Sequence, residues 1–127
     1  MFSQLLQYQD IGWLILRLAI AIIFIVHALS KLMKPAMMAS DMGMPTAGII
    51  MLGLVEFLSS VGLIFGVYTQ FASLLLAFVM LGAIYFKKFK WRVPFFAMDK
   101  TGWEFDFILL AANIAILFGG GWSIKIF

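Results

Sequence analysis

The sequence contains no cysteine. The chain therefore cannot form a disulfide, hold an iron–sulfur cluster through its own thiolates or relay electrons by thiol exchange. It has a single histidine, His27, which excludes a bis-histidine haem and any metal site built from several histidines. Haem held by His27 and a methionine stays open as an alternative. We predict no metal site and no intrinsic cofactor, so any redox chemistry depends on a group from outside the chain.

Charged residues are also scarce, at 12% of the sequence, whereas hydrophobic residues make up 65%. A soluble domain of 127 residues could not remove so much apolar surface from water. A membrane-spanning helix needs about 20 mainly apolar residues. Four apolar stretches come near this length, at about 11–33, 45–67, 70–87 and 103–119. We predict an all-α fold, an integral membrane four-helix bundle that forms one domain over residues 1–127.

The lysines and arginines outside the spans lie almost entirely in two of the connections. Residues 1–10 contain neither residue type, and the first apolar stretch exceeds signal-peptide length, so we expect a retained helix. With four spans, the side that holds both termini carries only Lys125. The positive-inside rule therefore predicts that both termini lie outside the cytoplasm. The opposite side carries Lys31, Lys34, Lys87, Lys88, Lys90, Arg92 and Lys100.

A basic run with interleaved aromatic residues, 87–92, follows the third predicted span. This composition also occurs in proteins that bind nucleic acid. Directly after a membrane span, however, such residues more often hold the helix end at anionic lipid headgroups. We predict contact with anionic lipids and no nucleic-acid partner. The apolar stretch that follows, 93–98, is too short to cross and is expected to lie at the interface or fold back over the bundle.

Ionisable side chains inside the apolar stretches mark the candidate site. An ionised group at the bilayer centre costs at least about 2.5–3.5 kcal/mol on insertion scales. Such groups are therefore expected to be paired, hydrated or functional. They are Arg17, His27, Lys31, Glu56, Glu104 and Asp106.

Helical geometry places three of these groups on one face of the first span. At 100° per residue, Arg17, His27 and Lys31 fall within about 80° of one another. A rise of about 1.5 Å per residue puts Arg17, counted from the outer edge of the first span, and Glu56, counted from the cytoplasmic start of the second, within one turn of the same depth. We therefore expect Arg17 to pair with Glu56 near the middle of the membrane.

The remaining acids open the fourth span on the cytoplasmic side. Glu104 and Asp106 should lie level with His27 and Lys31, and form a second charged layer with them. Because residues two apart on a helix point about 160° apart, the two acids cannot both face the bundle axis. Asn113, seven residues after Asp106, shares its face and extends the polar stripe.

Two interpretations of these charges remain open. The first is structural, since buried ion pairs can fix the register between helices without taking part in chemistry. The second is a functional polar site for a quinone headgroup, a small anion, a proton or a cofactor. A small-solute or proton transporter is a further alternative, although the broken spans typical of transporters are weak here. A stand-alone enzyme is the least favoured class, because we find no nucleophile–base pair, metal-ligand spacing or phosphate-binding loop.

Short motifs in a characteristic order resemble the DoxX family of small four-helix bacterial membrane proteins. The resemblance covers about residues 13–123. The motifs are Leu16-Arg17-Leu18, His27 with Lys31-Leu32, Gly43-Met44-Pro45, Leu54-Val55-Glu56 with Gly62 and Gly66, Phe95-Phe96, and Gly102-Trp103-Glu104.

The resemblance implies a bacterial inner-membrane subunit linked to redox or sulfur metabolism, since the family is related to the DoxD subunit of thiosulfate:quinone oxidoreductase. It thereby favours an accessory, quinone-linked subunit of a membrane oxidoreductase that assembles with other membrane subunits. A purely structural or assembly subunit is the alternative. The chain departs from the family pattern at Ala28, where members often have glycine, and at Gln70, where they often have arginine. Family membership indicates the fold more directly than the function.

Overall fold

The computed structural model describes residues 2–96, 98 and 100–119. Over these residues the chain is helical, with no β-strand. Three helical stretches are long and apolar enough to cross a membrane, at 3–33, 46–65 and 69–90. The predicted all-α membrane fold is confirmed.

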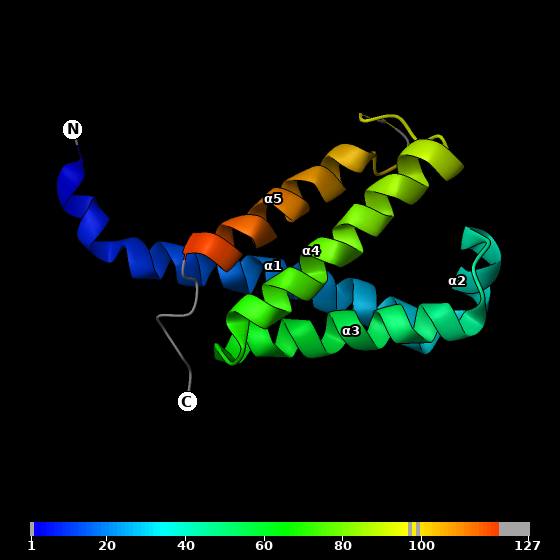
Figure 1. The fold of residues 1–127 in the computed structure, drawn as a ribbon, viewed down its shortest axis with the longest axis horizontal. Helices are drawn as coiled ribbons and strands as arrows, with labels where there is room; N and C mark the ends of the chain where they lie inside the picture. The colour runs from blue at the N-terminus through cyan, green and yellow to red at the C-terminus, as the bar shows by residue number, and fades with distance from the viewer. Residues whose placement is uncertain (1, 97, 99, 120–127) are drawn as a thin grey trace.

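The described residues form five α-helices, four long and one short, and Figure 1 shows their arrangement. A short 3₁₀ helix precedes the first of them, at Ser3–Tyr8, and a π-helical turn continues the fourth, at Phe86–Lys90. The α-helices are α1 at Gln9–Met33, α2 at Pro35–Met42, α3 at Thr46–Phe65, α4 at Thr69–Tyr85 and α5 at Trp103–Gly119.

Proline and glycine set the helix ends around α2 and α3. Pro35 begins α2, where a missing backbone N–H costs nothing because the first turn has no partner for it. Gly43 ends α2 with a φ of 68°, and Gly66 ends α3 with a φ of 78°. Glycine reaches this left-handed conformation without steric cost, so both positions suit an abrupt helix end.

The long helices form two closely packed antiparallel pairs. In Figure 1, α3 runs along α1 at the bottom of the view, while α4 rises diagonally beside α5. The main contacts are between α1 and α3 and between α4 and α5, and fewer join α3 to α4. The core where the pairs meet consists of Ile20, Ala21, Phe24, Leu63, Ala72, Leu76, Met80, Leu109 and Ile116.

Gly53 lets α1 and α3 approach closely. A Cβ atom built on Gly53 would lie 2.9 Å from Leu32 Cδ2 and 3.2 Å from Lys31 Cβ. A side chain at this position would therefore collide with the end of α1. Small residues at helix crossings are typical of membrane bundles, where close backbone approach replaces the hydrophobic effect.

Polarity in the molecule is reversed relative to a soluble protein. Large apolar side chains such as Ile15, Leu58 and Phe78 are more than 60% exposed. By contrast, the interior buries Arg17, Lys31, Glu56, Ser59, Ser60, Thr69, Ser73, Asp106 and Asn113. An apolar exterior over a partly polar interior indicates that lipid, not water, surrounds these helices.

Candidate functional site

Glu56 forms a buried ion pair with Lys31. The ammonium Nζ of Lys31 donates to both carboxylate oxygens of Glu56, at 3.2 Å and 3.0 Å. Both side chains are at most 10% exposed. The predicted pair of Arg17 with Glu56 was therefore wrong, because Lys31 fills that role.

The error comes from the relative height of α1 and α3. The prediction assumed that the end of the first span and the start of the second lie level at the cytoplasmic boundary. Instead, α2 lies between them and packs on α3, so the first turns of α3 extend past the end of α1. Gly53 consequently faces Lys31, and Glu56 lies only one turn further along α3.

Arg17 lies at a different level from this pair. It precedes Lys31 by fourteen positions in α1, which corresponds to about 21 Å along the helix axis. Its side chain is fully buried, with 0% exposure. The structure thus keeps Arg17 inside the bundle but outside the charged site around Glu56.

Asp106 belongs to a second ion pair, with Lys87. Lys87 Nζ lies 2.7 Å from Asp106 Oδ2, and the two side chains are 19% and 7% exposed. The sequence interpretation assigned Asp106 to the layer of His27 and Lys31, and treated Lys87 as a headgroup anchor. The position of Lys87 just beyond α4 concealed its role, because a lysine stem is long enough to extend back into the bundle.

Glu104 and Asn113, the other predicted site residues on α5, are not part of these pairs. Glu104 is half-buried, and its backbone N–H donates to the carbonyl of Phe95 at 3.0 Å. Within the described part of the chain it joins neither ion pair. Asn113 is fully buried, and its Nδ2 donates to the carbonyl of Leu109 at 2.8 Å. Asn113 does extend the buried stripe above Asp106, as predicted from their spacing.

His27 is an exposed residue of α1. Its Nδ1 lies 2.8 Å from the carbonyl oxygen of Ile23. Because a carbonyl oxygen only accepts, Nδ1 carries a proton in this contact. The imidazole ring lies 6.0 Å from the ring of Phe105 on α5, measured between centroids.

A cavity of about 600 Å³ brings these groups together. His27 and both ion pairs contribute to its walls, and the remainder is mainly apolar. A volume in the range of about 300–1,000 Å³, apolar walls and a few polar groups are typical of small-molecule sites. The apolar and aromatic lining includes Phe24, Met38, Met42, Met51, Phe78, Phe86, Trp91 and Phe105.

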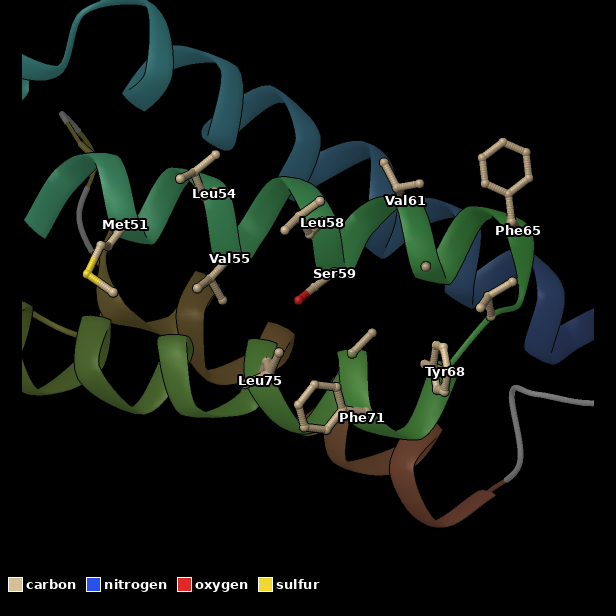
Figure 2. Close-up of a pocket in the computed structure, with 13 residues that line it drawn as sticks. Met51, Leu54, Val55, Leu58, Ser59, Val61, Phe65, Tyr68, Phe71 and Leu75 are labelled. Carbon is tan, nitrogen blue, oxygen red and sulfur yellow. The ribbon is translucent and has the colours of Figure 1, made fainter.

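A second hollow, an apolar groove of about 550 Å³, lies between α3 and α4 (Figure 2). Its lining contains no charged side chain, and Ser59 and Tyr68 bring the only side-chain hydroxyls among the described lining residues. Apolar walls alone cannot orient a polar ligand. We therefore place the candidate functional site at the charged cavity.

Comparisons with known proteins agree with the observed fold and with its membrane character. The family model described as DoxX matches residues 12–88. The chain is 32% identical over 114 residues to a protein of Bacillus subtilis (strain 168) named "Putative oxidoreductase CatD". That alignment covers 87% of this chain and 81% of the Bacillus protein. No solved structure matches the chain.

Proposed function

This chain belongs to the DoxX family, and from that premise we propose that it is a membrane subunit of an oxidoreductase complex that binds a quinone headgroup. The headgroup occupies the cavity that His27 shares with the Lys31–Glu56 and Lys87–Asp106 pairs. The observation that carries this proposal is the combination of apolar walls with five ionisable side chains around one cavity. The name of the Bacillus relative, which includes the word oxidoreductase, supports a redox role.

The chemistry of the cavity suits a quinone. A quinone ring is flat and apolar, with two carbonyl oxygens that accept hydrogen bonds. Lys31 and Lys87 supply N–H donors from opposite helix pairs, while Phe105 and Phe24 supply apolar and aromatic contact. Donors from two sides of an apolar cavity fix the orientation of a ligand that carries an acceptor at each end.

Quinone reduction consumes two electrons and two protons, and the electrons come from a redox centre of a partner subunit. The absence of cysteine excludes a thiol relay or a thiolate-held iron–sulfur cluster within this chain. Proton exchange is the part assigned to this chain. His27 is suited to relay these protons, because an imidazole can take up a proton from water and pass it to a reduced quinone oxygen, and His27 lines the cavity.

The proposal includes a location and a lipid environment. The subunit lies in the bacterial inner membrane with both termini outside the cytoplasm. The exposed cations Lys88, Lys90 and Arg92 lie at the end of the π-helical turn, where they are suited to anionic headgroups. Each basic residue near such a surface contributes about 1 kcal/mol of attraction.

A binding titration tests the quinone proposal. The purified protein in mild detergent is titrated with a quinone that has no tail, 2,3-dimethoxy-5-methyl-1,4-benzoquinone, and tryptophan fluorescence is recorded. Trp91 lines the cavity, so bound quinone should quench its emission. His27→Phe should weaken binding at least about tenfold, or about 1.4 kcal/mol, because the ring is replaced by an apolar one of similar size.

The alternative, a structural or assembly subunit, makes a different prediction for the ion pair. The combined change Lys31→Met with Glu56→Leu replaces the pair by apolar side chains, which a buried site tolerates. If the charges hold the ligand, the double variant folds and loses quinone binding. If it folds and binds as the wild type does, the charges are structural and the quinone site is rejected. Lys34→Met, outside the cavity and exposed, is the matched control.

A further inference from the structure

The groove between α3 and α4 has the shape and lining of a site for a single hydrocarbon chain. In Figure 2, Val55 and Ser59 on α3 face Leu75 and Phe71 on α4 across the groove. The two helices meet at the turn that follows α3 and diverge from there in Figure 1.

Met51 lies next to both this groove and the charged cavity. Its side chain lines both the apolar groove and the cavity that contains Lys31 and Glu56. The polar cavity and the apolar groove are therefore adjacent, and Met51 lies in the wall that they share. A molecule with a polar head in the cavity could extend an apolar tail past Met51 into the groove.

The size and lining of the groove suit an apolar ligand. Its volume of about 550 Å³ lies within the range of about 300–1,000 Å³ that is typical of small-molecule sites. A hydrocarbon chain in the groove would contact apolar side chains from both α3 and α4.

We propose that the α3–α4 groove binds the isoprenoid tail of the quinone whose headgroup occupies the charged cavity. This inference rests on the proposed function and adds to it the substrate class, a long-tailed quinone that enters from the bilayer between α3 and α4. Apolar burial of the tail supplies affinity, while the headgroup site supplies orientation. A phospholipid acyl chain shares the same apolar chemistry and is the competing occupant.

Two ligands that share one ring test this proposal. Binding of the tail-less benzoquinone is compared with binding of the same ring carrying a ten-carbon alkyl tail, and the affinity ratio is the readout. In the wild type the tailed compound should bind at least about tenfold more tightly. Val55→Trp fills the groove and should abolish that gain while the affinity for the tail-less compound stays unchanged, which also shows that the variant is folded.

Ile50→Trp is the matched control, because Ile50 lies on the same helix, is exposed and lines neither the groove nor the charged cavity. It corrects for uptake of the tailed compound by detergent, and should leave the affinity ratio at the wild-type value. Leu58→Trp is a second groove variant and should act as Val55→Trp does. Quinone should co-purify with the wild type and be lost from both groove variants, as measured by mass spectrometry of the lipid extract.

Three outcomes would overturn the tail assignment. An affinity ratio that is the same in the groove variants and the control rejects the groove while leaving the headgroup site intact. Loss of a phospholipid alone from the groove variants assigns the groove to a membrane lipid. If neither compound binds to the wild type, the quinone function fails and the tail assignment fails with it.

Discussion

At the scale of single residues, the carboxylate of Glu56 is the most constrained group in the charged cavity. It accepts both contacts from the Lys31 ammonium and is only 2% exposed. Removing one member of a buried pair leaves the other charge uncompensated, whereas replacing both by apolar side chains can be neutral. The contribution of this ion pair to the free energy of unfolding is therefore measured only by comparing the single variants with the double variant.

We expect Glu56→Leu to lower the free energy of unfolding by about 3–5 kcal/mol, because Lys31 would remain charged in an apolar site. Adding Lys31→Met should restore most of that loss. Thermal unfolding in detergent, followed by circular dichroism, measures both effects. Lys34→Met should change stability by no more than about 0.5 kcal/mol. A double variant that is less stable than Glu56→Leu alone would contradict the assigned pairing.

The sequence predicted that Glu56 has a cationic partner, but it could not distinguish Arg17 from Lys31. Helical periodicity correctly placed both cations on one helix, and the cost of burying charge correctly required a partner for Glu56. Which cation is the partner depends on the offset between α1 and α3. That offset is set by the packing of α2 and by the contact at Gly53. The periodicity of residues within a single helix cannot predict the offset between two helices.

At the scale of elements, the fit of α1 against α3 depends on a missing side chain. Gly53→Val should lower the free energy of unfolding by about 1–3 kcal/mol, because its Cβ would lie within 2.9 Å of Leu32 Cδ2. Gly12→Val in α1 is the control, since a Cβ there meets nothing within 4 Å. Thermal unfolding of both variants measures the difference. Equal stability of the two variants would show that α1 and α3 are not in close contact at Gly53.

The helices differ in how far the sequence predicted them. Long apolar runs gave α1, α3 and α4 directly, since only a membrane helix satisfies the backbone of such a run in lipid. The helix α2 was not foreseen, because eight residues after Lys34 were interpreted as a loop. Pro35 and Gly43 are start and stop signals in retrospect, but over so short a segment they suit a turn equally well.

At the scale of the whole molecule, the distribution of basic residues predicts the orientation in the membrane. The native chain has no cysteine, so a single substitution introduces a unique thiol. Ser3→Cys should react with a membrane-impermeant maleimide in intact cells, whereas Ser40→Cys on α2 should react only after the membrane is opened. Both positions are exposed, so access depends on the side of the membrane and not on burial. The reverse labelling pattern would invert the predicted topology.

Each of the two ion pairs lies within one antiparallel helix pair, which affects how the two helix pairs can move relative to each other. Lys31–Glu56 joins α1 to α3, and Lys87–Asp106 joins the end of α4 to α5, so each closes within one antiparallel pair. The less extensive α3–α4 contact, with its apolar groove, lies between the pairs. A movement of one helix pair relative to the other would therefore leave the Lys31–Glu56 and Lys87–Asp106 pairs intact.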